Sequence, residues 1–362
     1  MTQRRVHVVY EHGVDLRPFG SAQIRLLRPL GHPALQEHFE TTFNWAYRGE
    51  SADAVIVDRL WRSDLSLASA HKLVQDVRRG GARFIYALDD DFLSLPLTVA
   101  PDYFSAEKRQ VAEFWLREAD GVLVTTPVLQ RRLSAYTSNC VVLPNALDER
   151  LLMGGSPPPL ETPFGLRRIT IGYMGTFSHE VDWQIILPAW RKVYEQYGDI
   201  VEFQVIGVSE RIHVLAQHAG VPVRILQPRA EEVEYPLFML WFTGRVHWDI
   251  AVAPLLDTPF TQCKSDIKFL DYSALGAATI ASRISVYEAS VRHGETGWLA
   301  ENTVEAWVSA LNTLIVNAEL RSALAMQAQR YLLQERTLAR RAIDWKSTLD
   351  LLIGDSSGNQ GS

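Results

Sequence analysis

The chain has 362 residues, of which 47% are hydrophobic and 22% charged, and its formal net charge is -6 at pH 7. This length favours two domains over one, and the composition is that of a globular protein. The negative charge gives no reason to expect binding to nucleic acid. With only Cys140 and Cys263, neither a disulfide framework nor a zinc site is expected.

The apolar runs of the chain bear on its location in the cell. The apolar run that starts at Val6 is too short for a signal peptide, and no run approaches the 18 or more apolar residues of a membrane span. We therefore expect a cytoplasmic protein. Peripheral contact with the inner face of a membrane stays open.

Strands and helices alternate through the first 150 residues. Apolar runs predict strands at residues 6–10, 54–57, 83–88, 121–126 and 141–145. Helical spacing predicts intervening helices at residues 24–30, 68–78, 108–119 and 128–136. Alternation of this kind is typical of a parallel sheet covered by helices.

Polar residues follow two of these strands, at the edge where parallel sheets bind ligands. The first strand leads to His12 and Gly13, and the third leads to Asp89, Asp90 and Asp91. One interpretation is a solvated cap on the next segment. The spacing of Asp89 and Asp91 also fits a divalent-cation site, so a metal remains an alternative.

The helical run that starts near residue 24 carries Arg25 just after a glycine loop that contains Gly20. A glycine loop before a basic helix start suits an anion, although Gly20 alone also fits a simple turn.

The Gly- and Pro-rich run 154–159 predicts a linker, after which a second alternating set begins. Its strands are expected at residues 169–176, 201–206, 223–226, 249–256 and 278–282. Its helices are expected at residues 183–197, 265–276, 305–333 and 338–352.

The predicted helix at residues 265–276 carries the most functional information. Ser265 is a good N-cap, and Gly276 is a plausible end. Lys264, Lys268 and Asp271 share one polar stripe, so a diphosphate could bind at the helix start and a ribose diol at the carboxylate. The alternative is a solvated face with a Lys268–Asp271 ion pair.

Several segments resemble the retaining glycosyltransferases of the "group 1" family. They are ADGVLVTT at residues 119–126, VLPNALD at 142–148, IGYMGT at 171–176, KFLDYSALGAATIAS at 268–282 and HGETGWL at 293–299. The resemblance implies the GT-B fold, an α/β architecture of two Rossmann-like domains that face a central cleft.

The resemblance also implies how the domains divide the work. Residues 1–153 form an N-terminal domain on the acceptor side, 154–165 a linker, and 166–330 a C-terminal domain on the donor side. A C-terminal helix at residues 331–353 is expected to pack back toward the N-terminal domain, and residues 354–362 to form a disordered tail.

In the family, two acids bracket the donor helix. The second acid, which binds the ribose, falls on Asp271, whereas the first falls on Cys263. This departure leaves the donor sugar, and retention versus inversion, open. The donor-binding residues that we predict are Gly175, Thr176, His179, Lys264, Ser265, Lys268 and Asp271. The predicted catalytic residues are Asp89, Asp90 and His12, and the predicted acceptor or phosphate contacts are Gly13 and Arg25.

The function implied is transfer of a sugar from a nucleotide-diphosphate sugar to a glycan, lipid-linked or small-molecule acceptor. We expect retention, no required cofactor and no catalytic metal, with any magnesium outside the chemistry, in a surface polysaccharide or glycoconjugate pathway. A nucleotide-sugar epimerase with the same fold and a non-catalytic sugar-nucleotide-binding member remain alternatives. A metal-dependent GT-A enzyme would leave the second alternating set unexplained.

Overall fold

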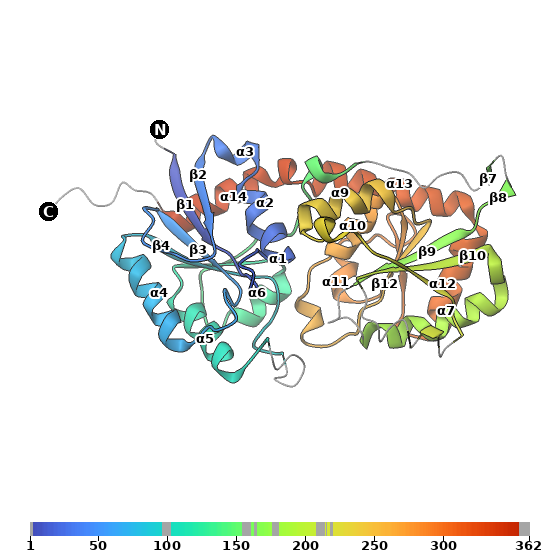
Figure 1. The fold of residues 1–362 in the computed structure, drawn as a ribbon, viewed down its shortest axis with the longest axis horizontal. Helices are drawn as coiled ribbons and strands as arrows, with labels where there is room; N and C mark the ends of the chain where they lie inside the picture. The colour runs from blue at the N-terminus through green and yellow to red at the C-terminus, as the bar shows by residue number, and fades with distance from the viewer. Residues whose placement is uncertain are drawn as a thin grey trace. The chain divides into compact units, whose positions relative to one another are not determined.

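The computed structural model describes residues 3–95, 103–153, 161–162, 165–175, 181–207, 214, 216–217 and 220–354. Contacts divide the chain into two units, each an α/β assembly around its own sheet (Figure 1). Unit 1 comprises residues 1–148, 263–265 and 338–362, and unit 2 comprises residues 149–262 and 266–337. The chain therefore passes from one unit to the other at four points.

Unit 1 is built on a six-stranded parallel sheet with the order β2-β1-β3-β4-β5-β6. These strands are β1 (Arg4–Val9), β2 (Phe39–Asn44), β3 (Ala54–Asp58), β4 (Arg83–Leu88), β5 (Gly121–Val124) and β6 (Cys140–Val142). Because β1 lies between β2 and β3, the residues that follow β1, β3 and β4 meet at one edge of the sheet.

Three of the longer helices of unit 1 begin at side chains that cap N–H groups of their first turn. The helices of this unit include α4 (Leu67–Arg79), α5 (Ala106–Glu118), α6 (Pro127–Leu133) and α14 (Leu338–Ile353). Ser66, Ser105 and Thr126 each accept a backbone N–H in the first turn of the helix that follows. Short turns α1 (Gly20–Ala22), η1 (Gln23–Leu27), α2 (Arg28–Leu30) and α3 (Pro33–Gln36) cover the segment after β1.

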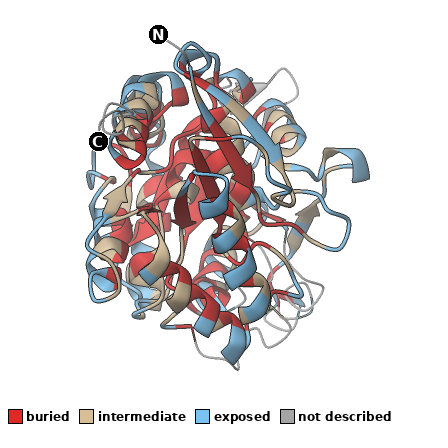
Figure 2. Cartoon of the chain, turned by 90° about the vertical axis from the view of Figure 1, so that its left-hand side faces the viewer, coloured by how far each residue is buried: buried red, intermediate tan, exposed pale blue. Residues whose placement is uncertain are grey.

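The last helix completes the core of unit 1. Trp345, Leu349 and Leu352 of α14 pack among buried residues of the sheet. Figure 2 shows this core as buried strands framed by helices with exposed outer faces. A Cβ atom at Gly121 would lie 2.5 Å from Leu352, so the close approach of α14 to β5 requires a residue without a side chain.

Unit 2 has a second six-stranded parallel sheet, with the order β11-β10-β9-β12-β13-β14. Its strands are β9 (Ile169–Met174), β10 (Val201–Ile206), β11 (Val223–Leu226), β12 (Ile250–Ala253), β13 (Ala278–Ser282) and β14 (Trp298–Ala300). Its helices include α7 (Trp183–Tyr197), α9 (Tyr235–Arg245), α10 (Ile267–Leu275), α11 (Ser285–Glu288), α12 (Val304–Val316) and α13 (Ala318–Glu335).

Large aromatic side chains fill the core of unit 2. Trp183, Trp190 and Trp307 are fully buried there, so these tryptophans are core residues rather than exposed sugar platforms. A Cβ atom at Gly172 would lie 1.8 Å from the Trp248 ring, so only glycine fits at this point of β9. Among the described helices, none has both the length and the apolar composition needed to cross a bilayer.

The structure corrects several predicted elements. Strand β2 and helix α9 were not predicted, and the helix expected at 305–333 is two helices separated at Asn317, which caps the second. Helix α10 begins at Ile267, with Asp266 rather than Ser265 at the N-cap position. The last helix, α14, begins at Leu338, as the helix predicted at residues 338–352 does, whereas residues 331–335 of the predicted C-terminal segment belong to α13.

Two predicted segments lie wholly or largely beyond the described residues. Of the predicted linker 154–165, residues 154–160 and 163–164 are outside them, whereas β7 (Glu161–Thr162) pairs antiparallel with β8 (Gly165–Leu166). Of the predicted tail 354–362, only Gly354 is described.

Candidate functional site

Helix α10 is held at the edge of the unit 2 sheet where β9 and β12 end. The Tyr272 hydroxyl accepts the N–H of Met174 at 3.0 Å and donates to the carbonyl of Val252 at 3.2 Å. Gly276 ends the helix in the left-handed region, with φ 74°, as its sequence position predicted. The helix is therefore fixed to two strands at once.

Asp271 is buried on this helix, with 5% of its surface exposed. Its Oδ1 atom has no hydrogen-bond partner among the described residues. Burial raises the pKa of Asp271 to about 7, while the charge of Lys268 opposes the rise and that of Asp266 adds to it. This buried acceptor is unlike the solvated helix face that was the alternative interpretation.

Lys268 lies one turn before Asp271, against an aromatic ring. Its Nζ atom is 3.4 Å from the Tyr173 hydroxyl and 4.9 Å from the centre of the Tyr173 ring. A cation over an aromatic face keeps its charge while its stem is partly buried. Lys268 and Asp271 therefore bring a cation and an acceptor to the same end of the sheet.

Gly175 follows β9 at this edge, and its N–H donates to the carbonyl of Ile206 at 3.1 Å. A Cβ atom at Gly175 would lie 2.5 Å from the Tyr173 hydroxyl, so the turn has no room for a side chain. The predicted donor contacts Thr176 and His179 lie outside the described residues.

In unit 1, Arg59 is the centre of a half-buried charge network. It follows β3 with φ 43°, and its Nε atom is 3.2 Å from Glu11 and 3.3 Å from Asp89. The Tyr103 hydroxyl donates to Glu11 at 2.7 Å. Left-handed backbone in a non-glycine residue is uncommon and costs energy, so the surrounding contacts must hold Arg59 in place.

The three adjacent aspartates have different partners. Asp90 accepts a hydrogen bond from Lys264 Nζ at 3.1 Å, and its other carboxylate oxygen lies 4.0 Å from the Arg59 guanidinium. Asp91 is buried and accepts both the N–H and the hydroxyl of Ser94, so it holds a turn. The pairing of Asp89 with Arg59 and of Asp91 with Ser94 differs from the shared cation site that their spacing suggested.

Burial raises the pKa of two carboxyl groups next to this network, those of Asp58 and Glu11. Burial, and then the charge of Glu11, raise the pKa of Asp58 to about 8. Burial also raises the pKa of Glu11, although Arg59 opposes the rise. Asp58 accepts the N–H of Glu11 at 3.1 Å, which links β3 to the residue after β1.

Sequence reasoning missed Glu11, Arg59 and Tyr103. The dipeptide Asp58-Arg59 at a strand end was the available signal, because residues after β1, β3 and β4 share one edge of the sheet. Their pairing depends on the order of the strands, which local sequence does not contain.

The other predicted residues of unit 1 lie in or near this edge. His12 Nδ1 is 2.7 Å from the carbonyl of Gly13, and its ring meets Trp45 edge-on. Arg25 is buried in the π-helical turn η1 and donates to the carbonyl of Leu143 at 2.8 Å. This bond links η1 to the segment after β6, so Arg25 has a structural role, and its predicted acceptor or phosphate contact stays a prediction.

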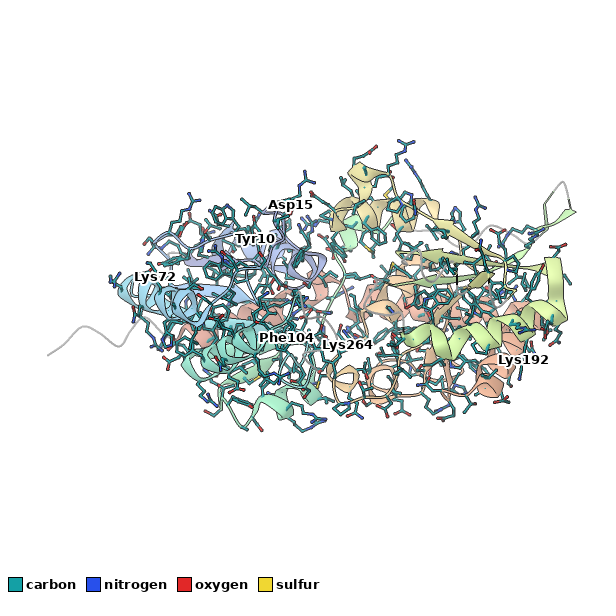
Figure 3. The ribbon with its side chains drawn as sticks, turned by 60° about the horizontal axis from the view of Figure 1, so that its bottom comes forward. Tyr10, Asp15, Lys72, Phe104, Lys192 and Lys264 are labelled. Carbon is teal, nitrogen blue, oxygen red and sulfur yellow. The ribbon has the colours of Figure 1, made fainter. Side chains whose placement is uncertain are left out.

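Lys264 and Ser265 belong to unit 1 by their contacts, whereas Lys268 and Asp271 belong to unit 2. Lys264, labelled in Figure 3, pairs with Asp90, and the Ser265 hydroxyl accepts the side-chain N–H of Asn145 at 2.8 Å. The predicted donor stripe is therefore divided between the two units, although its members are close in sequence.

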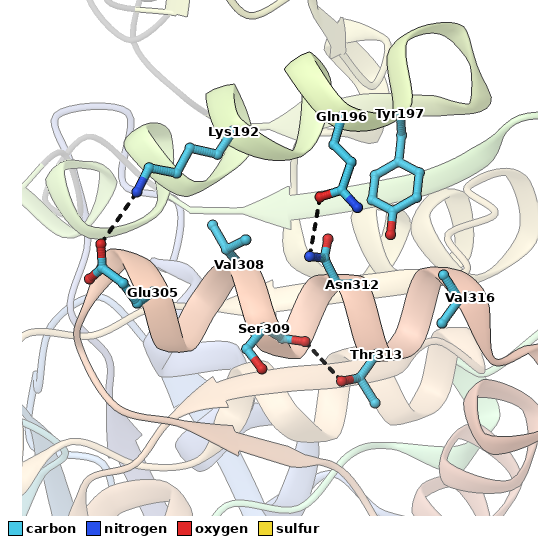
Figure 4. Close-up of a pocket in the computed structure, with 9 residues that line it drawn as sticks. All are labelled: Lys192, Gln196, Tyr197, Glu305, Val308, Ser309, Asn312, Thr313 and Val316. Atoms are coloured by element: carbon cyan, nitrogen blue, oxygen red, sulfur yellow. Dashed lines mark hydrogen bonds and ion pairs between the residues drawn. The ribbon is translucent and has the colours of Figure 1, made fainter.

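A groove with a cavity volume of about 520 Å³ lies elsewhere on unit 2, between α7 and α12 (Figure 4). Across it, Lys192 pairs with Glu305 and Asn312 donates to Gln196, each at 3.3 Å. None of the predicted site residues lines it. We interpret it as the seam between two packed helices rather than as a reaction site.

The family comparison concerns the unit that carries α10. Residues 168–317 match the family model described as "Glycosyl transferases group 1". This stretch of unit 2 is therefore similar to the group 1 glycosyltransferases. The matched range contains Lys268, Asp271 and Gly175, so the buried carboxylate lies in the part of the chain that the family defines. No curated protein sequence matches the chain.

Solved structures extend the likeness to both units. HepE of Anabaena, in complex with UDP and glucose, is 16% identical with TM-score 0.66, and the match covers 96% of this chain and 100% of HepE. Sucrose-phosphate synthase of Thermosynechococcus elongatus is 13% identical with TM-score 0.71, over 97% of this chain and 99% of that one.

TarM of S. aureus is 11% identical with TM-score 0.62, over 85% of this chain. This chain spans only 57% of the length of TarM. At these identities the matches establish the fold. Together with the two six-stranded parallel sheets, they show that this chain has the GT-B fold.

Proposed function

We propose that this glycosyltransferase binds a nucleotide-diphosphate sugar through α10 of unit 2. The observation that carries the proposal is Asp271, a buried carboxylate on the donor helix whose Oδ1 atom has no hydrogen-bond donor in the part of the chain that the structure describes. A ribose diol would supply two donors to it. Lys268, one turn earlier, and the positive end of the α10 helix dipole suit the diphosphate.

UDP is the first nucleotide to test, because HepE was solved with UDP and with UDP-glucose. That likeness supports the choice of probe, whereas the base and the sugar for this chain remain to be measured. We propose a glycan or lipid-linked acceptor in polysaccharide or glycoconjugate synthesis.

From unit 1 we assign Asp89 and Asp90 to stabilise the positive charge that develops on the transferred sugar. Lys264, Lys268 and the start of α10 would stabilise the leaving diphosphate without a metal. In a retaining front-side reaction that diphosphate can accept the proton of the acceptor hydroxyl. An inverting reaction would need a base, for which His12, Asp89 and Asp90 are the candidates.

Cys263 occupies the position of the first family acid, and it is fully buried. Burial raises the pKa of its thiol to about 12, so it is neutral at physiological pH. It therefore replaces a charged acceptor of hydrogen bonds with a neutral, weakly polar group. We propose that the carboxylates after β4 supply the negative charge that this position lacks.

The test is a thermal-shift panel of UDP, GDP, dTDP, ADP and CMP, each with and without magnesium. A nucleotide at 100 times its dissociation constant stabilises the protein by about 2.7 kcal/mol, which a melting curve resolves. A shift with one nucleoside diphosphate, independent of magnesium, is the expected result. No shift with any nucleotide would contradict the donor site.

Product analysis then separates the reaction classes. Incubation with the nucleotide-sugar alone should leave its sugar configuration unchanged, whereas an epimerase would change it without any acceptor. A shift on nucleotide binding with no transfer to any acceptor would favour the non-catalytic alternative.

A further inference from the structure

A buried ion pair precedes the donor helix in unit 2. Arg336 donates to both carboxylate oxygens of Asp266, at 2.7 and 2.9 Å, and to the Tyr331 hydroxyl at 2.8 Å. Only 7% of the Arg336 side chain and 10% of the Asp266 side chain are exposed. A two-pronged bond of this kind fixes the carboxylate in orientation as well as in position.

Asp266 is the N-cap residue of α10, yet its side chain caps no N–H group of the helix. Its carbonyl accepts the N–H groups of Phe269 and Leu270, which makes it part of the first turn. Arg336 therefore holds the first turn of the helix in place through its hydrogen bonds to the Asp266 side chain. The Phe269 ring also stacks on the Tyr331 ring at 6.1 Å, so α13 supports the same turn.

The negative charge of Asp266 is unfavourable for binding an anion at the start of α10. A lone carboxylate two residues before Lys268 would repel a diphosphate at the start of α10 and disfavour ionisation of Asp271. The guanidinium of Arg336 compensates that charge where solvent screening is weak. Without it, Asp266 would be left as a buried, unpaired anion, which is strongly unfavourable.

We propose that Arg336 is a positioning residue of the donor site. It compensates Asp266 and fixes the first turn of α10, so that Lys268 and Asp271 are presented to a nucleoside diphosphate. The proposal rests on the proposed donor function for the identity of the ligand.

Unit 2 offers a matched control. Arg167 donates to both carboxylate oxygens of Asp249, at 2.6 and 2.8 Å, and Asp249 is also buried. Arg167 and Asp249 lie just before β9 and β12, at the N-terminal ends of these strands. The donor helix is held at their C-terminal ends. This pair has the same chemistry and a comparable structural role, with no link to α10.

The experiment compares Arg336→Met with Arg167→Met, and measures the melting temperature and the dissociation constant for UDP or for the nucleotide that the panel selects. Both variants should melt at lower temperature, because each leaves a buried carboxylate unpaired. Only Arg336→Met should also lose affinity, by about tenfold or more, and Arg336→Lys should lose less.

A second variant separates charge from packing. Adding Asp266→Asn to Arg336→Met removes the unpaired anion, so most of the lost nucleotide affinity should return. Equal affinities in Arg336→Met and Arg167→Met, or no recovery in the double variant, would overturn the positioning role. If Arg336→Met does not fold, the single variants Asp266→Asn and Arg336→Lys are compared with the wild-type protein instead. Wild-type nucleotide affinity in both single variants would overturn the positioning role.

The two failures are distinguishable. If the wild-type protein binds no nucleoside diphosphate, the donor function fails and the role of Arg336 fails with it. If the wild-type protein binds and Arg336→Met binds equally well, only the role of Arg336 fails.

Discussion

In both sheets of this protein, carboxylates lie where the parallel strands end, but their hydrogen-bond and ion-pair partners differ. In unit 1, Glu11, Asp89 and Asp90 are paired with Arg59 and Lys264. In unit 2, Asp271 is buried with one oxygen that has no hydrogen-bond partner among the described residues. A buried polar atom without a partner costs about 1–3 kcal/mol, and a ligand that supplies a donor recovers that cost.

The charged groups of the first site have partners within the protein, whereas the second has a buried acceptor without one among the described residues. The network around Arg59 holds its charges in place before any substrate binds, as a site acting in the transition state requires. In the proposed function, a nucleotide would supply the missing hydrogen-bond donor at the end of the sheet that carries Lys268 and Asp271. Substitutions in unit 1 should therefore affect turnover, whereas those in unit 2 should affect binding.

The largest expected effect is on turnover. We predict that Asp90→Asn lowers kcat by about 100-fold or more while the dissociation constant for the nucleotide changes little, as for a group that acts mainly in the transition state. Asp64→Asn, at an exposed aspartate that pairs with Arg62, is the control. Normal turnover in Asp90→Asn would show that this network is structural.

The next effect is on binding. Lys268→Ala should weaken nucleoside diphosphate binding by about 1.5–3 kcal/mol, the scale of hydrogen bonds to charged groups. Lys192→Ala removes a lysine of the same unit whose ammonium pairs with Glu305, and it should leave binding unchanged. Calorimetric titration measures both. Equal affinity in the two variants would remove the phosphate assignment.

A smaller effect concerns pH. Because the pKa of Asp271 is raised to about 7 and its charged form accepts the diol, nucleotide affinity should rise by roughly tenfold from pH 6 to pH 8. Asp271→Asn should bind weakly and retain only the pH dependence of the nucleotide phosphates. The same pH profile in both proteins would show that another group controls binding.

The smallest effect is on stability alone. The pKa of Asp58 is raised to about 8, so between pH 4 and pH 8 the folded state binds more protons than the unfolded state, and stability falls as pH rises. Asp58→Asn still accepts the N–H of Glu11 and removes this dependence. Its melting temperature, relative to wild type, should therefore increase from pH 5 to pH 8.5. A constant difference would contradict the raised pKa.

Much of the fold followed from short-range patterns. Continuous apolar runs marked most of the central strands, and Gly276 marked the end of α10. Strand β2 escaped because its sequence, FETTFN, is polar and partly exposed at the edge of the sheet. Helix α9 escaped because YPLFMLWFTGR has apolar residues on most of its surface, so it shows no helical periodicity.

Only part of the candidate site could be predicted from the sequence. Lys268 and Asp271 lie on one helix, where spacing alone predicts their proximity. The link of Glu11 to Arg59, and that of Asp266 to Arg336, join residues far apart in sequence. Such pairings depend on strand order and helix packing, which the local sequence does not determine. The N-cap assignment of Ser265 was wrong because its hydroxyl bonds instead to Asn145.

The most direct test of the donor site is calorimetric titration of UDP, or the nucleotide that the panel selects, at pH 6.5 in two buffers with different ionisation enthalpies. The comparison yields the number of protons released on binding. Asp271 is mostly protonated at this pH before binding, since its pKa is about 7, so binding should release protons in the wild-type protein and fewer in Asp271→Asn. Absence of binding, or equal proton release by the two proteins, would contradict the assignment of the ribose to this carboxylate.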